Sequence, residues 1–565
     1  MEKRKVLCMM VAFCMLTLGF LLSGERVKAA EETPASSFEY EVLDDGTIEI
    51  TKFSGIENDV VVPKKINGTE VTSLGSMCFS QCSDINSVYI PDSIKNVGEW
   101  CFYQCENLIS VKLPKNMKNI GEWTFKGCKN LKNIQIPENV TSIGGRAFSE
   151  CSSLIAIQIP EGVKRIGIYA FSECSNLKTV NIPEHMMIIE QGTFNECSKL
   201  TSIKIPDSIT EIEQYAFCDC SALTNVNLPK DIKMINNSSF ARCISLKNIA
   251  IPESVVSIGN SAFFKCSSFT EVMVPDKVQE IGEDAFALCE NLKKIKIPEG
   301  VKGIENGTFA FCNKLENITL PSSIEKIGER AFCRCHSLKY IKIPDNVSTI
   351  GDSAFYDCRH LTNITLGSKV STIGESAFAN CYSMKSITIL GKIKNIDMYS
   401  LGYNSVLDEN NQETDEYERK VDFEIIGQAD NTKLIQYAKK NGIRYRVLGS
   451  KEDDPSNNKK NPNLTVGGSQ LAKNVSEPSK VKIKKLSAAK KKVTINIKKA
   501  SNATKYQVQF SLKKNMKKAK TKIFKGVKYT IKKLKSKKTY YIRVRGINSK
   551  GKVGAWSKIK RVKVK

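Results

Sequence analysis

A phenylalanine returns every 23 residues along most of this 565-residue chain. The spacing continues without an insertion over fourteen positions, and a cysteine stands three residues after each phenylalanine. A fixed period of this length predicts a solenoid, because one short unit cannot bury its own apolar face and must stack on the next. The repeated phenylalanines are Phe79, Phe102, Phe125, Phe148, Phe171, Phe194, Phe217, Phe240, Phe263, Phe286, Phe309, Phe332, Phe355 and Phe378.

Each unit predicts one short strand and one tight segment on the opposite side. A leucine, two alternating apolar residues and a proline recur in order, as in Leu131, Ile134, Ile136 and Pro137. Alternation favours a strand, and a proline ends it because proline cannot donate to the ladder. The Ala-Phe-x-x-Cys segment is typical of a short helical turn or a tight loop. We therefore expect a curved parallel β-sheet of stacked coils.

The sequence Cys333-Arg334-Cys335-His336 raises the question of a metal or redox site. Cys335, however, is one of the fourteen repeated cysteines, and no second ligand type repeats with them. We therefore interpret these cysteines as small buried core residues. Disulfides between neighbouring coils are the alternative, since exported proteins meet an oxidising environment. The same two interpretations apply to Cys78 and Cys101. The repeated cysteines are Cys82, Cys105, Cys128, Cys151, Cys174, Cys197, Cys220, Cys243, Cys266, Cys289, Cys312, Cys335, Cys358 and Cys381.

The chain shows no sign of catalytic chemistry. It lacks the metalloprotease, serine-hydrolase, phosphate-loop and dinucleotide-binding motifs. Its three histidines, His185, His336 and His360, fall in different units. A cysteine–histidine pair at Cys335 or Cys358 is the alternative. The sequence thus predicts no catalytic residue, no cofactor and no metal, and we expect that the protein is not an enzyme.

Two columns of the repeat are predicted to form a partner-binding surface. Residues eight and ten positions after each phenylalanine should point outward from the concave face of the sheet. A long polar face without a deep pocket suits a protein or glycan better than a small molecule. Tyr89, Met273 and Tyr340 are the expected anchors, and a merely solvated scaffold is the alternative. The predicted partner-binding residues are Tyr89, Lys112, Lys204, Met273, Lys294, Lys296, Tyr340 and Lys342.

An acidic row lies just past the repeat prolines. The row is formed by Asp92, Glu138, Glu161, Glu184, Asp207, Glu253, Asp276, Glu299 and Asp345.

The ends of the repeat predict caps, which solenoids need to cover their terminal coils. Residues 31–70 contain an alternating hairpin with an Asp45-Gly46 turn. The repeats occupy 71–407, where Ile396, Leu401, Asn404 and Leu407 form a degenerate fifteenth unit. Residues 408–449 add an acidic insertion, a strand at VDFEIIG that is expected to be the last strand of the solenoid, a capping helix ending at Gly442 and then another strand.

The repeat C-x-x-L-x-x-I-x-I-P-x-x-V-x-x-I-G-x-x-A-F resembles the BspA-like, or Treponema-type, leucine-rich repeats of bacteria. The resemblance covers roughly 38–449. The repeat glycine and the repeat proline are replaced in a few units: Glu190, Glu213, Asn236 and Glu305 stand for Gly, and Gly367 and Leu390 for Pro. The resemblance implies a leucine-rich repeat solenoid with 23-residue coils and short helical turns opposite the sheet. It also implies a role in adhesion to an extracellular partner.

Residues 1–30 are predicted to be a secretory signal peptide. Three basic residues, Lys3, Arg4 and Lys5, precede an apolar run from Val6 to Leu22. Cleavage is expected after Ala29 or Ala30. The apolar run is also long enough for an uncleaved membrane anchor, which is the alternative. No later segment is predicted to span a membrane, so the expected location is secreted or bacterial cell surface.

The C-terminal part carries the excess positive charge. After a polar linker at 450–477, residues 478–565 hold 32 Lys and Arg and no acid, whereas the whole chain has a net charge of +26. Alternating apolar residues predict a β-sandwich. The stretch YTIKKLKSKKTYYIRVRG (529–546) resembles fibronectin type III domains, with Leu534 six residues before the corner residue Tyr540.

So basic a domain should attract an anionic wall or matrix polymer, while no motif predicts sequence-specific nucleic-acid binding. A lysine coat that only increases solubility is the alternative. For the whole chain we expect a secreted or surface-associated binding protein, adhesin-like, whose solenoid binds a protein or glycan. A structural spacer without a specific partner is the alternative.

Overall fold

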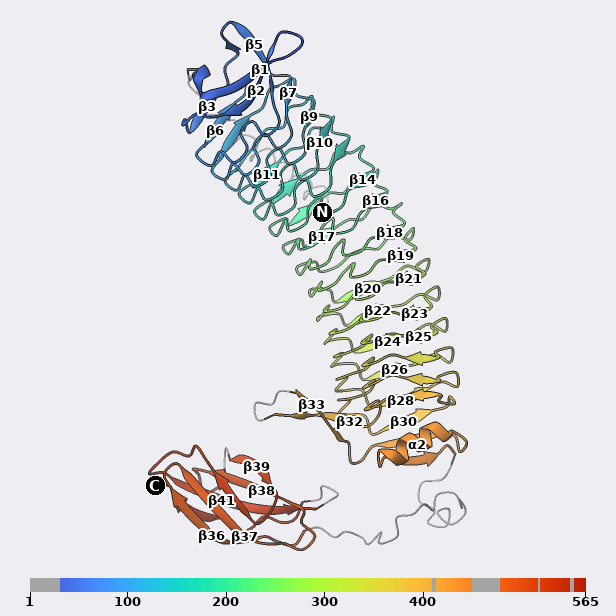
Figure 1. The fold of residues 1–565 in the computed structure, drawn as a ribbon. Helices are drawn as coiled ribbons and strands as arrows, with labels where there is room; N and C mark the ends of the chain where they lie inside the picture. Colours follow the sequence, from blue (N-terminus) through green and yellow to red (C-terminus); the bar gives the residue numbers. More distant parts are fainter. Residues whose placement is uncertain (1–30, 409–412, 450–477, 517–518, 549–552) are drawn as a thin grey trace, which may run out of the picture. The chain divides into compact units, whose positions relative to one another are not determined.

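The computed structural model describes residues 31–408, 413–449, 478–516, 519–548 and 553–565. The predicted signal peptide and the predicted linker lie outside these residues. The chain divides into two compact units, Met1–Leu448 and Gly449–Lys565, each coloured along the sequence in Figure 1. No described helix combines the length and the apolar character needed to cross a membrane.

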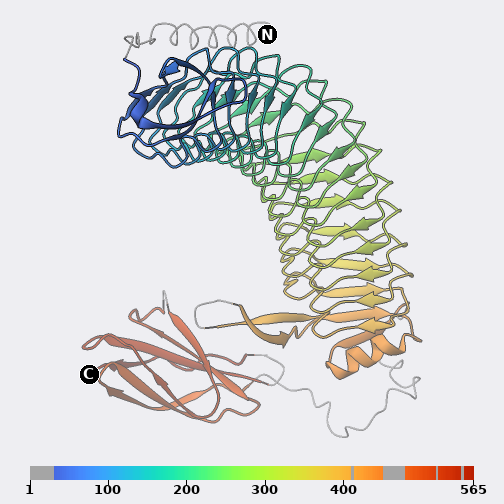
Figure 2. The same cartoon turned by 45° about the horizontal axis from the view of Figure 1, so that its top comes forward.

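The first unit is a β-solenoid in which each turn of chain lies beside the next, and the stack curves along its length (Figure 2). The predicted strand of most coils pairs in parallel with an equivalent strand 23 residues away, for example Ile364 with Ile387. These strands form the first strand row. It comprises β6 (Ser87–Tyr89), β8 (Ser110–Lys112), β11 (Ala156–Ile157), β13 (Thr179–Val180), β15 (Ser202–Ile203), β17 (Asn225–Val226), β20 (Glu271–Met273), β22 (Lys294–Lys296), β24 (Asn317–Thr319), β26 (Tyr340–Lys342), β28 (Asn363–Leu366) and β30 (Ser386–Ile389).

A second row of parallel strands runs along the solenoid, and the sequence interpretation missed it. Each of its strands is only two residues long and ends at an isoleucine or valine of the repeat. The row comprises β7 (Asn96–Val97), β9 (Asn119–Ile120), β10 (Ser142–Ile143), β12 (Arg165–Ile166), β14 (Ile188–Ile189), β16 (Glu211–Ile212), β18 (Met234–Ile235), β19 (Ser257–Ile258), β21 (Glu280–Ile281), β23 (Gly303–Ile304), β25 (Lys326–Ile327), β27 (Thr349–Ile350), β29 (Thr372–Ile373) and β31 (Asn395–Ile396).

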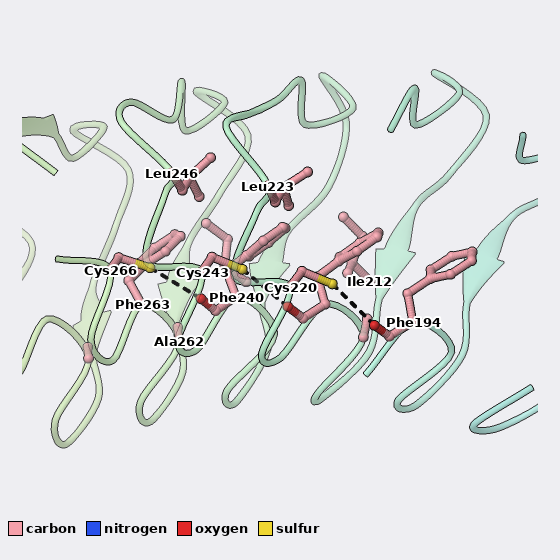
Figure 3. Close-up of a cluster of buried hydrophobic side chains, with 14 of the residues drawn as sticks. Phe194, Ile212, Cys220, Leu223, Phe240, Cys243, Leu246, Ala262, Phe263 and Cys266 are labelled. Carbon is pink, nitrogen blue, oxygen red and sulfur yellow. Dashed lines mark hydrogen bonds between the residues drawn. The ribbon is translucent and has the colours of Figure 1, made fainter. Parts of the chain in front are cut away.

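The fourteen phenylalanines form a continuous ring stack through the core. Neighbouring ring centroids are 5.0–5.9 Å apart and the planes are within 20° of parallel. Phe53 of the N-terminal hairpin extends the stack, with its ring 5.3 Å from that of Phe79. Each ring buries a large apolar area and adds an offset-stacking contact to it. The stack therefore joins neighbouring coils by apolar contact, together with the buried leucines and isoleucines of the repeat (Figure 3).

The Ala-Phe-x-x-Cys segments form tight turns, the second of the two forms that the sequence allowed, and not helices. Arg146 and Glu150, on either side of Phe148, have positive φ angles of 54° and 64°. With these angles, the amides of Arg146, Phe148 and Glu150 all donate to carbonyls of the next coil, at 2.8–2.9 Å. Positive φ costs about 1–2 kcal/mol per non-glycine residue, and these bonds between coils offset that cost.

The repeat glycine lets neighbouring backbones approach closely. A Cβ atom built on Gly144 would lie 2.6 Å from the backbone nitrogen of Glu122 in the preceding coil. Contacts this short require a local backbone shift, and the coils that carry Glu190, Glu213, Asn236 or Glu305 at this position still stack.

The N-terminal end of the solenoid is closed by an antiparallel hairpin, as predicted. Its strands β1 and β2 pair from Phe38–Phe53 to Val42–Ile48, and Gly46 in the turn has a φ of 77°. Strand β2 then pairs in parallel with β5, which starts the second strand row. The elements of this cap are η1 (Ala35–Ser37), β1 (Phe38–Val42), β2 (Ile48–Phe53), β3 (Asp59–Val61), β4 (Lys65–Ile66) and β5 (Thr69–Leu74).

At the other end, the acidic insertion lies inside the fifteenth coil instead of after it. Strands β32 and β33 form an antiparallel hairpin, after which β34 rejoins the first strand row beside β30. The strand at VDFEIIG is not the last one, because β35 pairs beyond it. The last strand of a parallel sheet has unpaired N–H and C=O groups along its outer edge. In this sheet the last strand is β35. The elements are β32 (Tyr403–Leu407), β33 (Glu413–Arg419), β34 (Glu424–Gly427), α2 (Thr432–Lys440) and β35 (Arg444–Val447).

Buried polar groups hold α2 and the hairpin to the last coils. Asn431, which is 1% exposed, accepts a hydrogen bond from the Ile393 amide and donates one to the Gly391 carbonyl. The Tyr437 hydroxyl accepts from the Leu401 amide at 3.1 Å. The Lys420 ammonium group donates to three carbonyls, those of Cys381, Tyr382 and Met384. These bonds satisfy the open backbone groups at the solenoid's end.

The second unit is an antiparallel β-sandwich with its own core. One sheet has the order β36-β37-β40 and the other β39-β38-β41-β42. Val493, Ile495, Val508, Ile542 and Val544 are fully buried between them. The lysines alternate with these residues and lie outside. The strands are β36 (Lys482–Ala489), β37 (Lys492–Lys498), β38 (Lys505–Ser511), β39 (Lys520–Phe524), β40 (Lys528–Ile531), β41 (Thr539–Ile547) and β42 (Lys560–Lys563).

Candidate binding face of the solenoid

Five of the eight predicted partner-binding residues come together on neighbouring strands of the first row. Strands β20, β22, β24 and β26 form one four-stranded sheet. Its register places Met273, Lys296 and Lys342 in one outward line, and Lys294 and Tyr340 in the other. Tyr340 is 59% exposed and Met273 is 61% exposed, whereas the central residue of each of these strands is buried.

The remaining predicted residues lie elsewhere along the row. Tyr89 and Lys112 are neighbours on β6 and β8, and the ammonium nitrogen of Lys112 lies 4.9 Å from the centre of the Tyr89 ring. Both are half-buried, so they present less surface than Tyr340. Lys204 is exposed on the loop that follows β15.

The lysine column and the acidic row pair with each other. Lys112 binds Asp92 at 2.7 Å, and Lys296 binds Asp276 at 2.8 Å. Lys204 forms the equivalent pair with Glu184. Each pair joins a lysine to the acid of the preceding coil, so these three lysines are partly neutralised. Exposed pairs contribute little stability, but they fix where the lysine heads lie.

A groove opens in this face at Ala250. This residue is the smallest in the column that lies ten positions after each repeat phenylalanine, the column that contains Lys112, Lys204 and Lys296. Ala250 occupies the position that holds Lys, Gln, Asn, Thr, Tyr or Met in the other coils. It forms only an isolated bridge with Asn227, so the sheet is interrupted there. The groove has a volume of about 520 Å³, and Met273, Glu253, Glu271 and Lys296 are among its lining residues.

A second groove, of about 510 Å³, crosses the turns on another side of the coils. It is lined by two columns of the repeat, one acidic and one of serines. Arg242 and Asp219 close one end with a 3.6 Å ion pair. The lining residues are Lys129, Glu150, Ser152, Glu173, Ser175, Glu196, Ser198, Asp219, Ser221 and Arg242. The sequence interpretation did not single out these columns.

His336 binds a buried carboxylate and not a cysteine. Its Nε2 lies 3.0 Å from Asp357 Oδ2. Asp357 is fully buried, and Arg359 donates two hydrogen bonds to it at 2.8 and 2.9 Å. The Cys335 thiol points elsewhere and donates to the Phe309 carbonyl. The Cys-Arg-Cys-His sequence therefore combines one repeat cysteine with a buried ion cluster.

The repeated thiols form a hydrogen-bonded ladder. From Cys105 to Cys381, each S–H group donates to the phenylalanine carbonyl 26 residues earlier, at 2.9–3.3 Å (Figure 3). Cys82, at the first position, is half-buried and lies 3.8 Å from the Ser80 carbonyl. The ladder thus has a polar role that the sequence did not reveal.

Burial raises the pKa of every ladder thiol. It raises the pKa of Cys82 to about 11 and that of Cys312 to about 12. The shift is larger still for Cys243 and Cys289, which are fully enclosed and also lie near other thiols. A raised thiol pKa disfavours the thiolate, which is the nucleophile and the metal ligand. Within the described residues, no group of three or more His, Cys, Asp or Glu side chains could hold a metal ion.

In the β-sandwich, two arginines pack against one tryptophan on the outer face of the four-stranded sheet. The guanidinium carbons of Arg543 and Arg545 lie 4.4 and 4.5 Å from the Trp556 ring centre. Arg543 also donates to Gln509, and Arg545 to Gln507. Cation–π stacking and these bonds hold both guanidinium groups in defined positions.

Fold and surface together define a bacterial-type leucine-rich repeat solenoid with an immunoglobulin-like domain. The family model of the BspA type leucine rich repeat region matches residues 60–178, 142–270, 233–336 and 279–408. These matches span more than half of the chain, so the chain belongs to the BspA type leucine-rich repeat family. The model of the Rha78A-like, N-terminal immunoglobulin domain matches residues 488–564. Neither model describes an enzyme domain.

Solved structures include similar solenoids. A leucine-rich repeat protein from Bacteroides ovatus is 31% identical, with 65% of this chain and 100% of that chain covered and a TM-score of 0.59. A leucine rich cell surface protein from Faecalibacterium prausnitzii is 27% identical. The match covers 65% of this chain and 96% of that chain, with a TM-score of 0.43. A leucine-rich repeat protein from T. pallidum is 25% identical. The match covers 46% of this chain and 91% of that chain, with a TM-score of 0.24. Among curated proteins, none matches the sequence.

Proposed function

We propose that the protein is a secreted or cell-surface-associated binding protein of bacteria, adhesin-like, whose solenoid holds an extracellular partner. The observation that carries the proposal is the outward face of β20, β22, β24 and β26. There Met273 and Tyr340 expose large apolar side chains on strands whose central residues are buried. Tyrosine and methionine are enriched in protein interfaces relative to the rest of the surface. The signal-like N-terminus supports export.

The double variant Tyr340→Ala/Lys342→Ala tests this face. Both side chains point outward from β26 while Ile341 between them is buried, so their removal should leave the fold intact. Aromatic anchors of interfaces typically contribute 2 kcal/mol or more. We therefore expect binding to intact host cells, measured with the secreted full chain, to weaken by about 30-fold.

The matched control is Asn363→Ala/Thr365→Ala, at the equivalent outward positions of β28. It should bind host cells like the parent protein and melt at the same temperature. Equal binding by the Tyr340/Lys342 variant would remove this face from the proposal. A full chain that binds no host cells or matrix would instead favour the structural spacer.

We further propose that the basic β-sandwich binds an anionic polymer of the cell wall or matrix. Residues 478–565 contain 32 Lys and Arg and no Asp or Glu, and the buried core of the sandwich contains none of these basic residues. The strand arrangement of three plus four supports the finer comparison with fibronectin type III domains. So does the Tyr540 hydroxyl, which accepts a hydrogen bond from the Lys535 amide at 3.2 Å, as in a tyrosine corner.

Salt dependence tests the electrostatic part of this proposal. Because the sandwich has its own core, residues 478–565 can be produced alone and applied to washed cell envelopes. Retention should be strong at about 50 mM salt and lost by about 500 mM, since the Debye length falls well below 10 Å. Retention that persists at high salt would indicate a different, apolar contact. No retention at low salt would leave the lysines as a solubilising coat.

A further inference from the structure

The groove at Ala250 lies at one of the interruptions of the first strand row. Ile249 and Ile251, on either side of Ala250, are buried to 7% and 8% exposure and form part of the lining. Met273 on the next strand stands beside them as an exposed apolar wall. No aromatic residue lines the groove, so it lacks the flat rings on which sugars stack. A long, narrow aliphatic stem fits such a lining better than a sugar ring.

The rim of the groove is acidic. Glu253, Glu271 and Asp276 contribute three carboxylates against the single ammonium group of Lys296. Lys296 is already bound to Asp276 at 2.8 Å. Glu253 and Glu271 have no ion-pair partner among the described residues, and both are exposed. These two exposed carboxylates lie beside the apolar lining, with Glu271 in register with Lys294 on β22.

We propose that this groove binds a lysine or arginine side chain of a protein partner. The aliphatic stem would pack on Ala250 and Met273, and the cationic head would meet Glu253 and Glu271. Lys and Arg commonly bury the stem while the charged head stays at a polar rim. Methionine suits such a site because its flexible thioether adapts to the bound stem. This inference rests on the proposed function of the solenoid. It specifies that the partner is a protein with an accessible basic segment.

The test fills the groove with a residue that the repeat already uses. Ala250→Gln places at this position the side chain that stands there as Gln135 and Gln158 in other coils. Coil stacking should therefore be retained, which an unchanged melting curve would verify. The control is Thr365→Gln, in the same column but five coils away. Glu271→Gln removes one rim charge without changing the shape.

The probe is an array of short peptides, each with one lysine or arginine in an apolar context. Every peptide has a partner in which norleucine replaces lysine or citrulline replaces arginine. At about 150 mM salt we expect the full chain to prefer the cationic peptides by about 10-fold, the effect of one charged contact. Ala250→Gln should abolish this preference, Glu271→Gln should reduce it about threefold, and Thr365→Gln should preserve it.

Equal binding of cationic and neutral peptides by the parent chain, or no binding of either, would overturn the inference. So would an undiminished preference in a folded Ala250→Gln protein. These failures are distinct from failure of the proposed function. If the Tyr340/Lys342 variant still loses host-cell binding while Ala250→Gln keeps it, the solenoid binds a partner outside this groove.

Discussion

Raising the pH from 8 to 10 should sharply lower the melting temperature of the solenoid. The pKa of each buried ladder thiol lies above its unfolded value of about 8.5 because burial disfavours the thiolate. Below pH 8.5 both states are protonated, and the full stability is present. Above it the unfolded chain releases protons that the folded chain retains, so unfolding becomes favoured. The loss is about 1.4 kcal/mol per thiol at one pH unit above that pKa.

The effect is large because the fully buried ladder runs from Cys105 to Cys381, one thiol per coil. Each thiol that is exposed in the same unfolding step adds its own loss, so the pH dependence grows with the number of coils that unfold together. Thermal unfolding followed by circular dichroism at several pH values, with a reductant present, measures the loss. Cys243→Ala should lower by one the number of protons released on unfolding, which sets the slope of the unfolding free energy against pH. A melting temperature that is the same at pH 8 and pH 10 would contradict the thiol ladder.

Phe217→Ala should divide the solenoid into two unfolding units. The Phe217 ring is fully buried and lies 5.5 and 5.4 Å from the rings of Phe194 and Phe240. Removing a buried phenylalanine side chain costs about 3–5 kcal/mol. In a stack that depends on contacts between neighbours, this loss weakens one junction. We expect a second, lower transition in thermal or urea unfolding.

Phe217→Leu is the matched control, since it keeps most of the apolar volume and should cost less than about half as much. Hydrogen exchange would locate the opened coils, which should include the ladder bond from Cys243 to the Phe217 carbonyl. A single transition at the parent temperature would show that the ring stack does not link the coils.

The repeat columns were enough to predict the architecture, since the 23-residue period is directly visible in the sequence. The second strand row was missed because Ser142–Ile143 and its equivalents are only two residues long and run into a glycine. Their pairing depends on close coil stacking and not on local propensity. The thiol ladder was found as a pattern, but its hydrogen bonds depend on the turn geometry around positive-φ residues such as Glu150.

The candidate site was predicted in part. The outward columns were located, but their pairing with the acidic row was not, although the constant spacing of Lys112 from Asp92 and of Lys296 from Asp276 was available in the sequence. The groove also had a sequence signal, the single alanine at 250 in a column of larger residues. The interruption of the sheet at this point, where Ala250 forms only an isolated bridge with Asn227, was not visible in the sequence. The β-sandwich was expected from strand alternation, and the matching family model is an immunoglobulin domain.

The uninterrupted spacing of the coils also determines how this chain could change its length in evolution. Excision or duplication of one whole 23-residue unit, for instance 152–174, returns every column to its place and leaves each surviving neighbour contact intact. Any other length change would rotate all later residues out of register. Recombination within the gene would therefore be tolerated in whole units. The distance between the two ends of the solenoid would change in steps of about one strand spacing, roughly 4.8 Å.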